Sequence, residues 1–191
     1  MVAEKSEKVD VAGRLRERFG EAVLAQAEFR GDLALTLPRE VIHDALRVLR
    51  DEPGLEFNFL ADVTVVDWLP LGRLPRFEVV YHLYSLGHHR RIRLKVPVEE
   101  DDRWVPTAID LWPGANWFER EAWDMFGVVF EGHPNMRRLL CHEDFEGHPL
   151  RKDFPADKRF FLIRPSDLRD EAPDWVKERS GGRRSAGYIP D

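Results

Sequence analysis

Residues 131–155 contain the side chains best suited to chemistry, in the sequence EGHPNMRRLLCHEDFEGHPLRKDFP. The tripeptide Gly-His-Pro occurs twice in this segment, and two adjacent cations follow each copy within a few residues. Histidines near a cysteine are typical of metal sites, paired cations of phosphate sites, and Gly and Pro of turns with a fixed shape. The segment therefore admits three hypotheses: a metal centre, an anion site or a pair of structural turns.

A metal centre would draw on His133, Cys141, His142 and His148. Structural zinc sites usually combine two close pairs of ligands, and only Cys141 and His142 are close here. Adjacent residues of a strand point to opposite faces, which weakens even that pair. A single cysteine also excludes an internal disulfide framework and an iron–sulfur cluster held by this chain alone. We therefore expect no metal on this chain.

An anion site would use the cations Arg137, Arg138, Arg151 and Lys152. Between positions 131 and 153 these four cations stand against five acidic side chains, which gives a net charge of −1. The whole chain has 29 basic and 35 acidic residues, a net charge of −6, which argues against a nucleic-acid binder. Because the planar guanidinium of arginine pairs well with carboxylates, ion pairs within the chain or at an interface are the favoured use of these cations.

The hypothesis of structural turns uses the residues on either side of each histidine. Gly132 and Gly147 permit backbone conformations that other residues avoid, and Pro134 and Pro149 favour extended geometry in the preceding histidine. Each Gly-His-Pro then forms a turn that presents the following cations to carboxylates on a neighbouring element.

A helix is expected just before this segment, at residues 116–127, NWFEREAWDMFG. Asn116 can cap its start, with Glu119 three residues later, and Gly127 can end it. One face is apolar and the opposite face is charged, and the tryptophans beside the apolar stripe indicate packing on more than one side. The charged residues on that opposite face are Glu119, Arg120, Glu121 and Asp124.

The role of this helix stays open between a core element and a partner surface, because tryptophans flank its apolar stripe. Arg120 and Asp124 are one turn apart, and an exposed pair of this kind contributes less than about 1 kcal/mol. Glu119, Glu121 and Asp124 resemble an acid/base set, but no histidine, nucleophile or phosphate loop lies in local register with them. We therefore expect no catalytic centre.

Hydrophobic periodicity predicts the elements that must position these residues. Helices are expected at 10–19 and 38–53, and strands at 22–29, 32–37, 57–68, 77–86 and 91–96. This order of helix, two strands, helix and three strands predicts an α+β fold, a two-layer domain with helices on one face of a mixed sheet.

The chain is expected to have three regions. Residues 1–104 form the α+β domain, residues 105–154 a block of short helices and Gly-His-Pro loops that packs on the domain and on partner subunits, and residues 155–191 an extended arm. Within the block, Thr107–Asp110 has the form of a capping box and predicts a short helix that Pro113 stops.

We expect no membrane anchor within this sequence. Its N-terminus lacks the apolar core of a signal peptide, and no segment approaches the roughly 20 apolar residues that span a bilayer. We expect an intracellular protein that reaches a membrane only through partners.

Residues 119–140, EREAWDMFGVVFEGHPNMRRLL, strongly resemble the signature of the C subunit of the proton-pumping NADH:quinone oxidoreductase, respiratory complex I. Residues 145–155, FEGHPLRKDFP, resemble the segment that follows it in that family. The predicted order of elements in the N-terminal half is also similar to the α+β domain of the family. Cys141 and His142 depart from the family's pattern, which further weakens the metal hypothesis.

The resemblance implies a hydrophilic subunit of the peripheral arm without a redox cofactor of its own. It implies packing against the large subunit of the quinone site and next to the iron–sulfur subunits, on the cytoplasmic side of the cell membrane in a bacterium. Iron–sulfur clusters, FMN, NADH and quinone are then held by partner subunits, through which electrons pass from NADH to quinone coupled to proton translocation.

Carried over position by position, the resemblance assigns a set of residues to structure and to contact with other subunits rather than to catalysis. The set is Glu119, Arg120, Glu121, Asp124, Phe126, Gly127, Phe130, Gly132, His133, Pro134, Arg137, Arg138, Gly147, His148, Pro149, Arg151, Lys152 and Asp153. Two alternatives remain: the same scaffold role in a membrane-bound hydrogenase or a dehydrogenase with another electron donor, and a free-standing zinc-binding protein.

Overall fold

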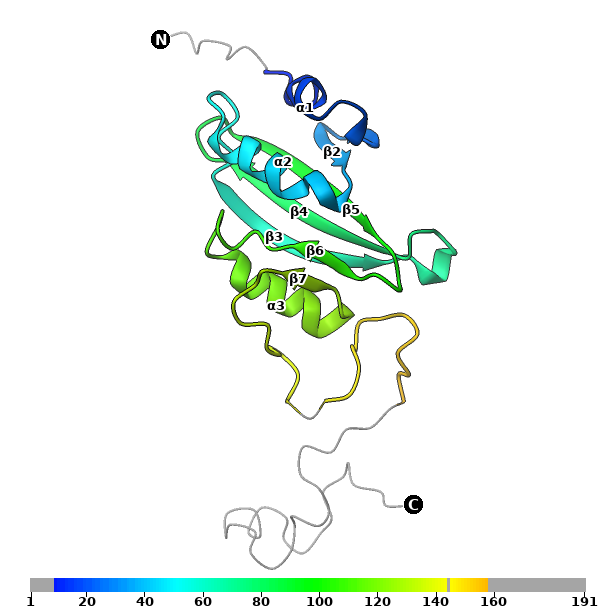
Figure 1. The fold of residues 1–191 in the computed structure, drawn as a ribbon. Coiled ribbons are helices and arrows are strands. Elements are labelled where there is room, and N and C mark those ends of the chain that lie inside the picture. The colour runs from blue at the N-terminus through cyan, green and yellow to red at the C-terminus, as the bar shows by residue number, and fades with distance from the viewer. Residues whose placement is uncertain (1–8, 144, 158–191) are drawn as a thin grey trace, which may run out of the picture. The chain divides into compact units, whose positions relative to one another are not determined.

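The computed structural model describes residues 9–143 and 145–157 (Figure 1). These residues include most of one compact unit, Met1–Phe154, and the start of a second unit that begins at Pro155. The arm expected at 155–191 lies almost wholly outside the described residues.

The main sheet of the described residues has five strands: β1 (Ala25–Phe29), β2 (Asp32–Thr36), β3 (Phe59–Asp67), β4 (Phe77–Ser85) and β5 (Arg90–Val98). Their order is β1-β2-β5-β4-β3, in which β2 and β5 run parallel and the other neighbours antiparallel. The predicted mixed sheet is therefore confirmed, and each of its strands lies within two or three residues of the expected bounds.

Two amphipathic helices precede and follow the β1–β2 hairpin: α1 (Val11–Phe19) and α2 (Arg39–Asp51). The Asp10 carboxylate caps α1 by accepting the N–H of Gly13 at 2.9 Å. A short 3-10 turn, Gly20–Ala22, ends this helix region, which is why β1 begins three residues later than expected. Another 3-10 turn, Leu69–Leu71, lies between β3 and β4.

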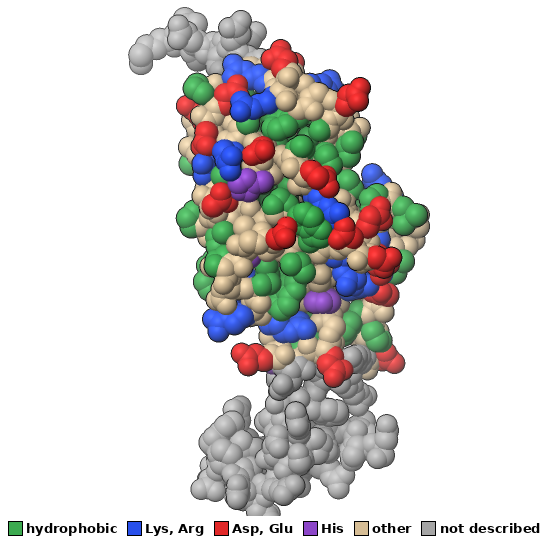
Figure 2. Space-filling view, viewed as in Figure 1, with side chains coloured by type: hydrophobic (Ala, Val, Ile, Leu, Met, Phe, Trp, Pro, Cys, Tyr) green, Lys and Arg blue, Asp and Glu red, His purple; other side chains and the backbone are tan. Residues whose placement is uncertain are grey.

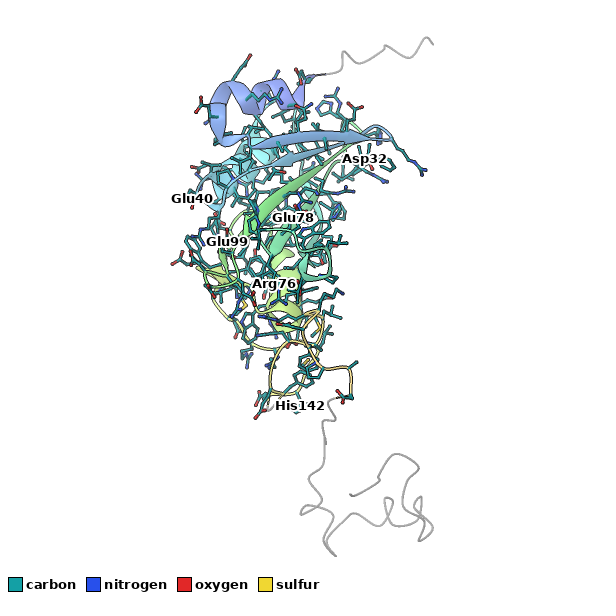
Figure 3. All side chains as sticks on the ribbon, turned by 90° about the vertical axis from the view of Figure 1, so that its right-hand side faces the viewer. Asp32, Glu40, Arg76, Glu78, Glu99 and His142 are labelled. Carbon is teal, nitrogen blue, oxygen red and sulfur yellow. The ribbon has the colours of Figure 1, made fainter. Side chains whose placement is uncertain are left out.

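Helix α2 lies on one face of the sheet (Figure 1). Ile42, Leu46 and Leu49 of α2 belong to the same buried core as Tyr81 and Leu94 of the sheet. Along β5, buried residues alternate with charged ones, as the sequence predicts. On the charged side, Lys95 pairs with the buried carboxylate of Glu78 at 2.9 Å, and Figure 3 shows Glu78 on its strand from the side.

The block after the sheet contains α3 (Ala115–Phe126) and a small parallel pair of strands, β6 (Trp104–Pro106) and β7 (Val129–Glu131). Helix α3 packs against β3, and its apolar residues join the core of the main sheet. The short strands were not predicted from the sequence.

Two local predictions in this block were wrong. Residues 107–110 form a turn rather than a short helix, because the Thr107 hydroxyl donates to Glu119 at 2.5 Å and Asp110 contacts His43 of α2 at 2.9 Å, so neither side chain completes a capping box. Helix α3 begins at Ala115, which puts Asn116 inside the helix instead of at its cap.

Candidate functional site

Residues 132–154, here called the wrapping loop, fold back over the C-terminal end of α3. The N–H of Leu150 donates to the carbonyl of Met125 at 3.1 Å, and Nδ1 of His148 lies 3.0 Å from the carbonyl oxygen of Asp124. The last carbonyls of a helix have no partner within it, so the loop supplies what the end of α3 lacks.

Asp124 is the polar centre of this arrangement. Its fully buried carboxylate accepts the N–H groups of Leu139, Leu140 and Cys141 at 2.8–2.9 Å and the guanidinium of Arg138 at 2.6 Å. Burial alone would raise the pKa of Asp124, but the donated hydrogen bonds outweigh it and hold the pKa below its usual value. Asp124 is therefore an ionised anchor for the wrapping loop.

Arg138 also connects the first half of the wrapping loop to its middle. Besides Asp124, its guanidinium donates to the carbonyls of Phe145 at 2.6 Å and Gly147 at 3.1 Å. The expected surface pair of Arg120 with Asp124 is wrong, since Arg120 instead donates to the carbonyls of Arg137 and Arg138.

Both Gly-His-Pro sequences form turns with glycine at positive φ, +84° at Gly132 and +94° at Gly147. Gly127, the predicted end of α3, has φ +81°, and its N–H donates to the carbonyl of Trp123 at 2.8 Å. Positive φ strains residues with a β-carbon, so these three positions explain the spacing of glycine in the segment.

The end of the wrapping loop is tied to the sheet by a second ionic cluster. Arg76, only 4% exposed, binds Asp67 at 2.9–3.0 Å and Asp153 at 2.9 Å. The N–H of Lys152 also donates to Asp67 at 2.8 Å, and Arg151 binds Glu100 at 2.9 Å. Figure 3 shows Arg76 among the packed side chains, well away from His142.

The electrostatics of this second cluster favour its charged form. Hydrogen bonds from Arg151 and Arg76 lower the pKa of Asp153 far below its usual range, and bonds to Asp67 and Asp153 raise the pKa of Arg76. Sequence reasoning missed Asp67, Arg76 and Glu100. No local signal marks them, because their partners are distant in the chain.

Glu119 also proves to be buried rather than solvent-facing, with 0% exposure. Its carboxyl accepts the Thr107 hydroxyl at 2.5 Å and the N–H of Ala108 at 2.7 Å. Burial raises the pKa of Glu119 to about 7, and burial together with Glu119 raises the pKa of Tyr81. The charged residues of α3 therefore differ in exposure, since Glu119 and Asp124 are buried and Glu121 is exposed.

The residues of the signature divide by exposure. Glu121, Arg137 and Lys152 are exposed, whereas Phe126 and Phe130 are in the core. The apolar side chains Trp117, Leu140 and Leu150 are also exposed, by 57%, 64% and 48%. On the face drawn in Figure 2, basic and acidic side chains are interspersed among hydrophobic ones, in keeping with the mixed composition.

The proposed metal ligands do not converge in the part of the chain that the structure describes, which contains no group of three or more His, Cys, Asp or Glu side chains arranged to hold a metal. The N–H of Asn135 donates to Nδ1 of His133 at 3.0 Å, and burial lowers the pKa of His148. Within the same residues, no helix is long and apolar enough to cross a membrane.

Comparison with known proteins gives one consistent result. Residues 35–160 match the model of the family described as respiratory-chain NADH dehydrogenase, 30 Kd subunit. The C subunit of NADH-quinone oxidoreductase from Roseiflexus sp. (strain RS-1) is 55% identical over 145 residues, which cover 76% of this chain and 82% of the relative. The corresponding subunit from Acidithiobacillus ferrooxidans is 39% identical over an alignment of 197 positions, which covers 93% of this chain and 98% of the relative.

Two solved structures share the fold. The trypsin-resistant fragment (1–134) of Nqo5 matches with a TM-score of 0.58 and 38% identity, over 65% of this chain and 98% of that one. A chain of a membrane-bound sulfane sulfur reductase, an archaeal respiratory membrane complex, matches with a TM-score of 0.65 over 95% of this chain and 94% of that one, but with 24% identity.

Proposed function

The chain belongs to the family of the 30 kDa subunit of respiratory-chain NADH dehydrogenase, which includes the C subunit of NADH-quinone oxidoreductase, and we propose that it is a structural, non-redox subunit of that complex. In this proposal it lies in the peripheral arm, against the quinone-site subunit and near the iron–sulfur subunits. Electrons then pass from NADH to quinone, coupled to proton translocation, through those partners, with no catalytic centre on this chain.

The observation that carries this proposal is that the buried polar side chains bind other groups of the same chain. Asp124 and Arg138 fix the wrapping loop to α3, and Asp67 and Arg76 fix its end to the sheet. A catalytic side chain must contact a substrate, whereas these four side chains bind backbone groups and one another. The arrangement supports a rigid block that offers a surface.

The surface of that block supports a role in contact between subunits. Trp117 on α3 and Leu140 and Leu150 on the wrapping loop are large apolar side chains left in solvent. Tryptophan and arginine are enriched at interface hot spots, and exposed apolar patches mark contact surfaces. We propose that the contact region is residues 105–154, carried by the α+β domain of residues 1–104, and that the arm 155–191 adds further contacts.

Cofactors and location follow from the same proposal. The chain has one cysteine, whereas an iron–sulfur cluster takes about four thiolates, so the clusters belong to partner subunits together with FMN, NADH and quinone. Attachment to the membrane is through partners, on the cytoplasmic side if the source is a bacterium.

A second candidate is the same scaffold role with another electron donor. The likeness to a chain of the sulfane sulfur reductase complex supports it at the level of fold, because that complex carries out a different reaction. The companion subunits distinguish the two candidates.

The test is affinity purification of the tagged full chain from gently solubilised membranes of its native source, with NADH oxidation and iron content measured on the same sample. Recovery with iron–sulfur subunits and NADH:quinone activity is expected. Recovery with the subunits of a hydrogenase-type complex would assign a different reaction to the complex and leave the scaffold role of this chain unchanged. Recovery of the chain alone, with stoichiometric zinc, would overturn the proposal.

A further inference from the structure

A pocket of about 520 Å³ lies between α3 and the first half of the wrapping loop. Its lining residues are Arg120, Trp123, Met136, Arg137, Arg138 and Glu143. We call it the arginine pocket. It is separate from the Asp67–Arg76 cluster, which ties down the other end of the loop.

Two of the three cations of the arginine pocket, Arg120 and Arg138, are held in place before any partner arrives. Arg120 donates to the carbonyls of Arg137 and Arg138 at 3.1 and 3.2 Å, and its guanidinium lies 5.2 Å from the Trp117 ring. Arg138 is fixed by Asp124. Fixed donors bind with a smaller loss of side-chain entropy than mobile ones, so Arg120 is a preorganised donor beside the mobile side chain of Arg137.

The charge of the arginine pocket is not balanced within the described residues. The Asp124 carboxylate neutralises Arg138, which leaves Glu143 against Arg120 and Arg137. Arg137 is exposed and forms no side-chain hydrogen bond or ion pair with any residue that the structure describes. A positive pocket on a chain of net charge −6 is complementary to an acidic group and not to the chain's own average surface.

From this geometry we infer that the arginine pocket receives an acidic side chain of a neighbouring subunit, whose carboxylate pairs with Arg137 and Arg120. The exposed Trp117 and Leu140 beside it select a segment in which apolar residues flank the acidic one. This inference rests on the proposed function and adds to it the chemistry of the partner. Arg137 is then the contact residue, whereas the adjacent Arg138 is a residue of the internal scaffold.

The first test is zero-length cross-linking in the purified complex. A carbodiimide joins lysine amines to carboxylates in direct contact but does not act on arginine, so Arg137→Lys introduces a reporter at the pocket. The expected product joins position 137 to an Asp or Glu of another subunit. Arg47→Lys is the positive control, since Arg47 lies 3.3 Å from Asp44 of its own helix and should give a product within the chain.

The outcomes separate this inference from the proposed function. If Arg137→Lys enters the complex and the control reacts, but position 137 gives no product or joins only an acidic residue of this chain, the inference is overturned and the scaffold role stands. If the tagged chain is recovered without partner subunits, the proposed function itself fails.

A second variant measures the contribution of the contact. Arg137→Glu should lower the amount of chain retained in the solubilised complex at least about fivefold relative to wild type, as for an interface residue whose loss costs over 1 kcal/mol. Equal retention of Arg137→Glu and wild type would also overturn the inference. Comparable levels of both chains in the cell extract show that the variant folds.

Discussion

The imidazole of His148 lies directly against Gly127, so closely that a β-carbon at position 127 would be 2.7 Å from the ring. His148 has little room to move away, because its Nδ1 is bonded to the Asp124 carbonyl. The glycine that ends α3 is therefore also the place where the second Gly-His-Pro turn docks.

Gly127→Ala should destabilise the chain by about 2–4 kcal/mol, from the strain of a β-carbon at φ +81° and the clash with His148. The measurement is the denaturation midpoint of the purified chain. Gly87→Ala is the control: φ is not positive there, a β-carbon added at that position would have no described atom within 4 Å, and the expected change is within about 0.5 kcal/mol. If the clash matters, the same change costs less in a His148→Ala background.

Asp124→Asn should cost about 3–5 kcal/mol, because it removes the negative charge that faces Arg138 and several backbone donors in a buried site. Urea unfolding of the purified chain measures the loss. Glu121→Gln, an exposed change on the same helix, should stay within about 0.5 kcal/mol. Equal effects of the two variants would show that Asp124 is not the anchor of the wrapping loop.

Arg76→Ala should destabilise the chain strongly, since it leaves the fully buried Asp67 carboxylate without its cation. The expected loss is about 3 kcal/mol or more, together with faster proteolysis within the wrapping loop, whose end is tied to Asp67 and Arg76. Arg73→Ala in the same connection is the matched control, because Arg73 is exposed and lies over the Trp68 ring. An unchanged rate of proteolysis in Arg76→Ala would show that the Asp67–Arg76 cluster does not hold the wrapping loop in place.

The stability of the chain should depend on pH through Glu119, whose pKa is raised to about 7. The folded state binds a proton that the unfolded state has released, so this contribution is fully present below about pH 4.5 and is lost as pH rises through 7. The loss amounts to about 3 kcal/mol. Glu119→Gln mimics the protonated carboxyl and should exceed wild type in unfolding free energy at pH 8 but not at pH 5, measured by urea titration.

Arg151→Ala should lower the amount of assembled complex while leaving NADH:quinone turnover per assembled complex unchanged. The reason is that Arg151 holds the end of the wrapping loop through Glu100 and Asp153 and touches no reacting group among the described residues. Activity normalised to iron content of the purified complex is the measurement. Normal assembly with reduced turnover would instead point to a role in the quinone or proton path.

The sequence predicted well those elements whose burial is one-sided. Strands β3 and β5 and helix α2 each have one buried face, so periodicity located them, and the fold class followed. The predicted start of α2 was one residue early, because Pro38 precedes the helix instead of lying in its first turn. The 3-10 turn at Gly20–Ala22 shortened β1 for a local reason that periodicity does not report.

The aromatic residues of α3 predicted packing on more than one side, but they did not identify the groups that its acidic residues contact. Helix α3 packs on β3 with one side and is covered by the wrapping loop on another, so its acidic residues are satisfied by backbone groups far away in the chain. The sequence of α3 shows where the charged residues lie, but it does not show which groups they contact. The same limit applies to β6 and β7, whose paired residues, such as Trp104 and Val129, are 25 positions apart and which are too short for a periodic signal. The assignment of Arg137 and Lys152 to partner contact stays a prediction.

The bond between Lys152 and Asp67 joins residues 85 positions apart, and this separation matters while the chain is being made. At about 5–20 residues per second, roughly 3 to 11 s pass between synthesis of Val98, the last residue of the main sheet, and synthesis of Asp153. During that interval Asp67 and Arg76 have each other but not the residues that later cover them. All strands of the main sheet are thus synthesised before the residues that cover the end of β3. Until then, the end of β3 is accessible to a chaperone or a protease.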